Sequence, residues 1–305
     1  MALTLPLGPS MRSDARRASF VILVSAFLAA AVVVTMVPSF AIHPASGHTR
    51  SAGIPSSTQS HKRLSAHHQA KAPKIAVVTR ARRHDELARL ATFGEPVFCG
   101  AGTKPLIALT FDDGPGVLTP QALKHLRGHH AKATFFLVGK LLKEPSFAAI
   151  AAFEAARGMA FGNHTWSHVL VTHGSPALYA RQISATSDVI HRATGQWPRL
   201  FRPPFGAHDH RLDAWLRSRG MLEILWSTDS LDSQGATTNK VLHTVIRGIR
   251  PGAIILLHEN RGTTETALPR ILHIIAKRGL RAVTVPKLLT LDPPTEKQLQ
   301  QHTCN

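Results

Sequence analysis

The chain has 305 residues, of which 44% are hydrophobic, and a formal net charge of +18. This length exceeds one average domain without requiring two, and the apolar fraction is sufficient for a sizeable core. The only cysteines are Cys99 and Cys304, which excludes a cysteine-rich zinc module. Because both stand near the edges of the folded region predicted below, a disulfide between them is one interpretation, and two unpaired thiols are the other.

An uncharged apolar segment over residues 18–42 comes first in chain order. Arg12, Arg16 and Arg17 stand immediately before it, which is the order found in a secretory signal or a signal anchor. The segment is longer than the roughly 7–15 apolar residues of a cleaved signal and long enough for the roughly 20 of a bilayer span. We therefore expect a membrane anchor, with residues 1–17 in the cytoplasm and the rest of the chain in the periplasm or outside the cell. Secretion after cleavage is the alternative.

Residues 43–92 are predicted to form a basic disordered linker, with a short helix around Glu86–Ala91 as its one regular element. Between His43 and His84 there is no Asp or Glu, but there are eight basic residues: Arg50, Lys62, Arg63, Lys71, Lys74, Arg80, Arg82 and Arg83. Such a surplus could attract nucleic acid, anionic lipid or an acidic polymer. Its place outside any apolar periodicity favours a solvated tether, and the chain has no recognisable nucleic-acid motif, so we expect no nucleic-acid partner.

From about Lys104 onward, short apolar or β-branched runs alternate with helical patterns. The predicted strands are Leu106–Phe111, Thr134–Val138, Leu222–Trp226, Ala253–Leu257 and Arg281–Val285. The predicted helices are Thr119–Arg127, Ser146–Arg157, Ala177–Thr194, Arg211–Arg219 and Thr264–Arg278. This alternation predicts parallel strands with crossover helices, in an open sheet or a barrel. Polar residues gather just after the apolar runs, where a barrel of this type carries its functional groups.

Two of these polar groups could form a metal site. Asp112 and Asp113 follow the run 106–109, and two adjacent carboxylates need a metal or another cation to stay ionised together. His164 and His168 are four residues apart, which would place them on one face of a helical turn. A plain Asp-Asp-Gly loop and a chance pair of surface histidines are the alternatives for each motif alone. Combined, one carboxylate and two histidines make a facial metal site with open positions.

Three further motifs are unremarkable singly and share only their position after apolar runs. They are Arg202–Gly206 (Arg-Pro-Pro-Phe-Gly), Asp229–Asp232 (Asp-Ser-Leu-Asp) and Leu256–His258 (Leu-Leu-His). In this order, the five motifs resemble those of the polysaccharide deacetylase (NodB homology) family of carbohydrate esterases. The resemblance covers roughly residues 104–290. It implies an α/β fold, a distorted (β/α) barrel, in a catalytic domain over residues 93–292 followed by a tail over residues 293–305.

The same resemblance implies an activity and a role for each matching residue. The activity is metal-dependent removal of N-acetyl groups from a polysaccharide or oligosaccharide that contains N-acetylglucosamine, such as a chitooligosaccharide or peptidoglycan. The metal ligands would be Asp113, His164 and His168, and the expected ion is zinc, with cobalt or nickel as alternatives. The catalytic residues would be Asp112 as general base, Arg202 as its partner, His258 as general acid, Asp232 as the group orienting it, and Phe205 through its backbone N–H. The substrate contacts would be Leu256, Pro204 and Trp226.

One departure from the family pattern concerns the acyl pocket. Ser233 follows Asp232 where the family commonly has Trp, so apolar surface is lost unless Trp226 or Trp166 replaces it. Three alternatives stay open: an amidohydrolase of the same fold, an O-acetyl esterase, and a glycan-binding module without catalysis. The sequence leaves the particular glycan and the oligomeric state open.

Overall fold

The computed structural model describes residues 86–304. The predicted anchor over residues 18–42 and most of the predicted linker lie outside the described residues. Between residues 86 and 304, no helix is both long and apolar enough to cross a bilayer.

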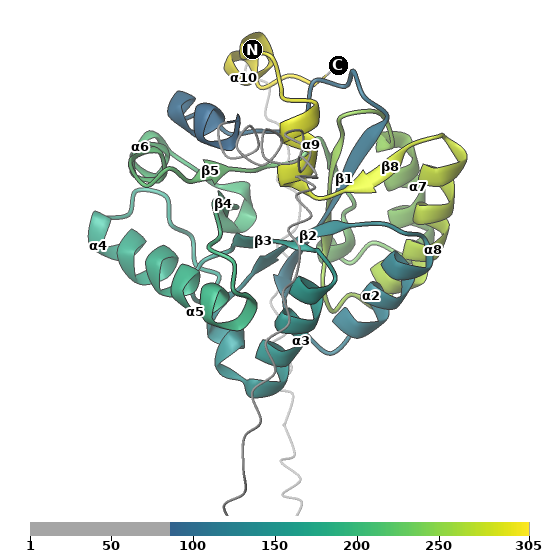
Figure 1. Ribbon diagram of the computed structural model, residues 1–305, viewed down its shortest axis with the longest axis horizontal. Helices are drawn as coiled ribbons and strands as arrows, with labels where there is room; N and C mark the ends of the chain where they lie inside the picture. Colours follow the sequence, from purple (N-terminus) through teal and green to yellow (C-terminus); the bar gives the residue numbers. More distant parts are fainter. Residues whose placement is uncertain (1–85, 305) are drawn as a thin grey trace, which may run out of the picture. The chain divides into compact units, whose positions relative to one another are not determined.

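A curled sheet of parallel strands forms the centre of the domain (Figure 1). The strand order is β5–β4–β3–β2–β1–β7–β6, and β8 pairs with the first residues of β1. The strands are β1 (Leu106–Gly114), β2 (Ala133–Leu137), β3 (Ala160–Asn163), β4 (Leu200–Phe201), β5 (Leu222–Glu223), β6 (Thr228–Asp229), β7 (Ile254–His258) and β8 (Arg281–Val283). This arrangement confirms the predicted parallel α/β architecture, an incomplete barrel. The short strands β3, β4 and β6 were not predicted.

The central strand β1 is apolar on both faces because both faces are covered. Ile107, Leu109 and Phe111 pack into one buried cluster, together with side chains of the outer helices. Leu106 and Ala108 point the other way, into a second cluster inside the curl. This alternation follows from the two-residue period of a strand, and burial on both faces explains the continuous apolar run.

Helices surround the sheet, and their bounds are α2 (Thr119–Gly128), α3 (Pro145–Ala156), α4 (Pro176–Tyr179), α5 (Ala185–Thr194), α6 (His210–Ser218), α7 (Thr238–Gly248), α8 (Gly262–Lys277), α9 (Val285–Leu291) and α10 (Glu296–Gln301). The predicted helix Ala177–Thr194 is divided into α4, a π-helical turn (Ala180–Ser184) and α5. Helices α7, α9 and α10 were not predicted.

The folded domain extends beyond the predicted range of residues 93–292 at both ends. A helix over residues 86–93 contributes Leu87, Leu90 and Ala91 to the inner cluster, and α10 contributes Leu299. The helix expected around Glu86–Ala91 is therefore confirmed, but it belongs to the domain and not to a linker that ends at residue 92. Likewise, residues 293–304 are part of the fold and not a tail.

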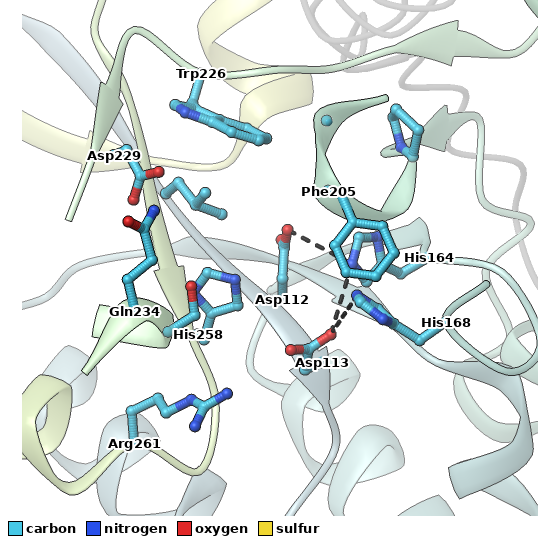
Figure 2. A pocket seen from close by; sticks show the side chains of 14 residues that line it. Asp112, Asp113, His164, His168, Phe205, Trp226, Asp229, Gln234, His258 and Arg261 are labelled. Carbon is cyan, nitrogen blue, oxygen red and sulfur yellow. Dashed lines mark ion pairs between the residues drawn. The ribbon is translucent and has the colours of Figure 1, made fainter. Parts of the chain in front are cut away.

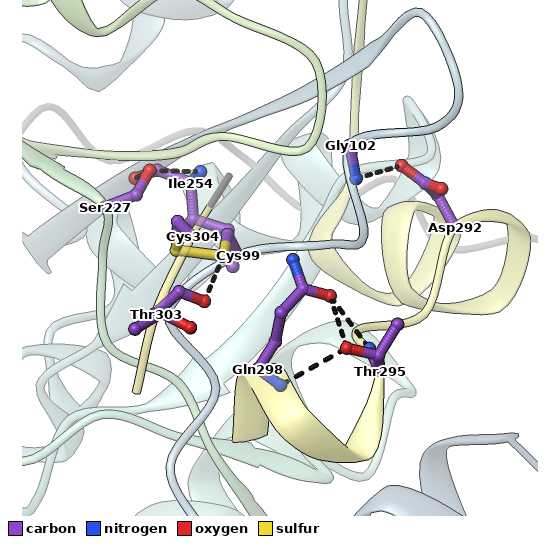
Figure 3. Close-up of a disulfide and its surroundings, with 9 residues drawn as sticks. All are labelled: Cys99, Gly102, Ser227, Ile254, Asp292, Thr295, Gln298, Thr303 and Cys304. Atoms are coloured by element: carbon purple, nitrogen blue, oxygen red, sulfur yellow. Dashed lines mark hydrogen bonds between the residues drawn. A yellow bond between two sulfur atoms is a disulfide. The ribbon is translucent and has the colours of Figure 1, made fainter. Parts of the chain in front are cut away.

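The two ends of the domain are fastened to each other (Figure 3). Cys99 and Cys304 form a disulfide, with 6.0 Å between their Cα atoms, which decides between the two interpretations left open by the sequence. The carboxylate of Asp292 accepts hydrogen bonds from the backbone of Gly102 at 2.9 Å and of Thr103 at 3.2 Å. These contacts join chain segments almost 200 residues apart at the amino-terminal side of β1 and β7.

Candidate active site

The carboxyl ends of the parallel strands bring the five motifs together around one pocket. Asp112 and Asp113 lie at the end of β1, and His258 ends β7, where it pairs with Asp112 in the sheet register. His164 follows β3 directly, and Arg202 follows β4. Because all strand pairs are parallel, these ends share one edge of the sheet, as predicted for a barrel of this type.

Asp113, His164 and His168 form a compact group of potential metal ligands (Figure 2). Oδ1 of Asp113 lies 3.2 Å from Nε2 of His168 and 3.6 Å from Nε2 of His164. Among the described residues, no hydrogen-bond partner reaches this buried carboxylate oxygen. A buried carboxylate oxygen facing two imidazole nitrogens without a donor is a suitable arrangement for a divalent cation, which prefers such oxygen and nitrogen ligands.

The chemistry of His164 fits the same interpretation. Its Nδ1 lies 2.7 Å from the backbone oxygen of Arg202, so Nδ1–H donates to that carbonyl and Nε2 keeps its lone pair for the ion. Burial lowers the pKa of His164 to about 3, so the imidazole is neutral at physiological pH, which is the form that binds metals.

The histidine pair lies in a loop, which corrects the expected helical turn. Residues 164–170 after β3 are irregular, and Thr165 and His168 have φ angles of 66° and 55°. Side chains hold the loop: Oδ1 of Asn163 accepts from the backbone N–H of Thr165 at 2.9 Å. Oε1 of Gln182 accepts from the backbone N–H groups of Trp166 and Ser167. The sequence did not predict that the side-chain amides of Asn163 and Gln182 would hold this loop. For Gln182, nothing in the sequence relates it to residues 166 and 167.

Asp112 and Arg202 form a fully buried ion pair beneath the pocket. One guanidinium nitrogen lies 2.8 Å from Oδ1 of Asp112, and the others donate to the backbone oxygens of Ile224 and Leu225. The guanidinium also lies 4.1 Å from the ring centre of Phe136. Burial raises the pKa of Asp112 above its usual value, while the charge of Arg202 opposes this rise. The other oxygen of Asp112, Oδ2, lies 3.8 Å from Nε2 of His164, at the edge of the metal-ligand group.

His258 lies on the opposite side of Asp112 from the metal-ligand group (Figure 2), and Asp232 holds it in place. Nδ1 of His258 lies 2.6 Å from Oδ1 of Asp232, and the hydroxyl of Thr264 also donates to this carboxylate. Burial lowers the pKa of His258, but the hydrogen bond to Asp232 and the nearby charge of Asp112 outweigh burial, so the pKa lies above its usual value. The histidine therefore keeps its proton to a higher pH than a free imidazole does.

Apolar and aromatic side chains form the remaining wall of the pocket. Leu256 and Trp226, expected to contact substrate, both line it, as does Phe205, but the proline on the wall is Pro203. Pro204, expected to contact substrate, is buried and does not line the pocket, because the Arg-Pro-Pro bend directs only its first proline toward it.

Phe205 lies against the metal-ligand group. The guanidinium of Arg202 lies 5.6 Å from the ring centre of Trp226. The Phe205 ring is 70% exposed and lies edge-on against His168, with 4.8 Å between ring centres. The Phe205 backbone has a φ of 64°, a left-handed conformation that is unusual for an aromatic residue and typical of functional turns.

The indole of Trp226 supplies the apolar surface that Ser233 lacks. Both residues line the pocket, whereas Trp166 packs against the outer core cluster. Of the two candidates for replacing the family tryptophan, Trp226 thus has the right position. Asp229, which begins the fourth motif but was given no role, also lines the pocket. Gln234 and Arg261 line it too and were not predicted, because isolated polar residues give no sequence signal.

Comparisons with known proteins agree with this fold and site. The family model described as polysaccharide deacetylase matches residues 100–224. A peptidoglycan-N-acetylglucosamine deacetylase of Bacillus cereus is 33% identical over 196 residues, which cover 63% of this chain and 70% of the relative. A chitooligosaccharide deacetylase of Azorhizobium caulinodans is 32% identical, with coverage of 61% and 86%. The chain spans only 40% of the length of the Listeria monocytogenes peptidoglycan-N-acetylglucosamine deacetylase PgdA, to which it is 34% identical.

Solved structures give the same result. The Bc1960 peptidoglycan N-acetylglucosamine deacetylase superposes with a TM-score of 0.60 at 32% identity, covering 63% of this chain and 91% of that protein. A family pseudoenzyme from Bacillus anthracis, BA3943, also superposes with a TM-score of 0.60, at 29% identity and with coverage of 65% and 69%. The chain therefore belongs to the polysaccharide deacetylase family, the NodB-like carbohydrate esterases.

Proposed function

We propose that this protein is an active metal-dependent deacetylase that removes N-acetyl groups from a glycan containing N-acetylglucosamine. The observation that carries the proposal is the position of Asp112, which lies between the Asp113–His164–His168 group on one side and His258 on the other (Figure 2). A base and an acid on either side of one pocket, beside a metal site, are the groups that amide hydrolysis requires.

Asp113, His164 and His168 would hold the ion, with zinc the expected metal and cobalt or nickel as alternatives. When bound, such an ion polarises an acyl oxygen and lowers the pKa of a water molecule. Asp112 would remove the proton from the attacking water, and its pKa, raised by burial, makes it a stronger base than an exposed aspartate. Arg202 would keep Asp112 oriented through the 2.8 Å contact to Oδ1, leaving Oδ2 free toward the pocket.

His258 would donate the proton that the departing amine needs. Asp232 holds the imidazole through Nδ1, so Nε2 is the nitrogen available to the substrate. The backbone N–H of Phe205 would stabilise the developing oxyanion, since a backbone donor fixed in a turn needs no rearrangement during the reaction. Leu256 and Trp226 would enclose the acetyl methyl group, in keeping with their place on the pocket wall.

Three observations support the proposed substrate class and location. The relatives named above act on peptidoglycan or chitooligosaccharides, which supports an N-acetylated envelope or extracellular glycan as substrate. The Cys99–Cys304 disulfide supports an oxidising compartment. Together with the apolar segment over residues 18–42, these observations favour a membrane-anchored protein with its catalytic domain in the periplasm or outside the cell, or a protein secreted after cleavage.

The second candidate function is a catalytically inactive glycan-binding domain, since the family includes a pseudoenzyme of similar structure. This chain keeps Asp112 and His258, each in contact with its partner Arg202 or Asp232, and all three metal ligands close together, and this favours catalysis.

Acetate release from a panel of N-acetylated glycans by the full chain tests the proposal. We expect release that EDTA abolishes and zinc or cobalt restores. If glycan binds but no substrate yields acetate in the presence of added metal, the binding-module function is correct and the enzyme proposal is wrong.

A further inference from the structure

A second group of potential metal ligands lies outside the pocket, where α6 packs beside β5 (Figure 1). It consists of His208, Asp213 and Glu223, whose donor atoms all lie within 4.8 Å of one another. His208 follows the Phe205 turn, Asp213 lies in α6, and Glu223 is the last residue of β5. The three side chains therefore connect a pocket loop, a helix and an edge strand.

Glu223 occupies a position where a strand normally carries an apolar side chain. Its neighbour Leu222 packs into the cluster inside the curl, so by the alternation of a strand Glu223 points to the outer face, beneath α6. Only 5% of Glu223 is exposed, and none of the described residues donates a hydrogen bond to either carboxylate oxygen. A buried carboxylate without a donor, whose nearest potential counterion is His208 with Nδ1 3.9 Å from Oε1, is costly and needs an explanation.

The distances around His208 match those of the candidate catalytic group. Nδ1 of His208 lies 3.4 Å from Oδ1 of Asp213 and 3.9 Å from Oε1 of Glu223. Two ligands of a tetrahedral zinc ion, each at about 2.0–2.2 Å from the metal, are about 3.3–3.6 Å apart. The corresponding distances from Asp113 to the two site histidines are 3.2 and 3.6 Å, so small side-chain movements would allow a common ion in both places.

Charge favours a cation over a shared proton. Burial, and then the charge of Asp213, raise the pKa of Glu223 well above its usual value, so one proton between the two carboxylates could relieve part of their repulsion. A single proton between Oδ1 of Asp213 and one oxygen of Glu223, however, would leave the other buried oxygen of Glu223 without a partner among the described residues. The hydrogen bond to Asp213 raises the pKa of His208, but an imidazolium would balance only one of the two carboxylates, whereas a divalent ion would balance both.

We propose that His208, Asp213 and Glu223 bind a second divalent metal ion, of the zinc class, with water completing its coordination. Imidazole and carboxylate ligands suit this ion. It would fasten the loop after Phe205 to α6 and β5, and would take no direct part in the chemistry of the pocket, whose lining is formed by other residues.

Zinc content per chain, measured by elemental analysis after loading and dialysis, tests the proposal on the full chain. We expect His208→Ala and Glu223→Gln each to hold one zinc equivalent fewer than the wild type. Asp188→Asn, which removes an exposed carboxylate from α5, should equal the wild type. Any zinc bound by the histidines of residues 43–84 is common to all four proteins and cancels in the difference.

The His168→Ala variant separates this proposal from the catalytic metal site. If both sites bind zinc, His168→Ala and His208→Ala each lose one equivalent and the double variant loses two. Loss in His208→Ala but not in His168→Ala would support the second site and contradict the catalytic metal. Wild-type zinc content in both His208→Ala and Glu223→Gln, with folding verified by circular dichroism, would overturn the second site in favour of a proton shared by the two carboxylates.

Discussion

Asp232 contacts His258 twice: its Oδ1 lies 2.6 Å from Nδ1 of the imidazole, and its Oδ2 accepts the backbone N–H of the same residue at 2.8 Å. The carboxylate thus fixes both the position and the tautomer of the histidine. Because the charged imidazole gains more from this contact than the neutral one, the pKa of His258 is raised despite burial.

A pH profile of Asp232→Asn tests this relationship. An acid catalyst works only while protonated, so activity falls as the pH rises through the pKa of His258. Asparagine removes the negative charge that raises this pKa while burial still lowers it, so the alkaline limb of kcat/KM should move to lower pH. Asp229→Asn, on the same pocket wall, should leave the limb in place. An unchanged limb in Asp232→Asn would contradict the role of His258 as acid.

Asp112→Asn should retain its metal but lose turnover. Asparagine can still accept the hydrogen bond from Arg202, but it cannot take a proton, and a general base contributes about 10²–10⁴-fold to a rate. We expect kcat to fall by this factor with zinc content unchanged. Since Arg202 then loses its buried counterion, a denaturant unfolding curve must show that the variant is folded at the assay temperature. Wild-type turnover would refute the assignment of the base.

Trp226→Ala should reduce kcat/KM by about fourfold, because burying one methyl group against apolar surface is worth about 0.8 kcal/mol. The indole and Ser233 both line the pocket, so Trp226 is our candidate for the apolar surface that the family tryptophan would otherwise provide. The matched control is Trp197→Ala, which removes an indole that is 59% exposed and stacks on His191. Equal effects of the two substitutions on kcat/KM would contradict a role for Trp226 in substrate binding.

Cys304→Ser should lower stability while preserving activity at low temperature. The Cys99–Cys304 disulfide closes a loop with a sequence separation of 205 residues, for which the loss of chain entropy in the unfolded state gives about 5 kcal/mol. Cys99 pairs with Ala253, just before β7, whereas His258 ends that strand, so the disulfide and the pocket lie at opposite ends. Urea unfolding and acetate release measure the two effects, and lost activity in a folded variant would show that the ends are coupled.

The long elements and the order of the motifs could be predicted from the sequence because both depend on local patterns. The run Leu106–Leu109 followed by two aspartates predicts a buried strand with a polar end, whatever surrounds it. The same reasoning gave the parallel alternation and the helices α2, α3 and α8. It failed for β4 and β6, whose two residues each are strand only because a neighbouring strand pairs with them.

Only the tertiary structure decided which residues meet. His164 and His168 suggested a helical turn from their spacing, but the amides of Asn163 and Gln182 hold them in a loop. The choice of Pro203 over Pro204 depends on how one bend faces the pocket, and the place of Glu223 beside His208 depends on the packing of α6 on an edge strand. Residue types and motif order determined the chemistry this chain can carry. Contacts across long sequence separations determined its geometry, because side-chain direction and burial are properties of the packed chain and not of any one segment.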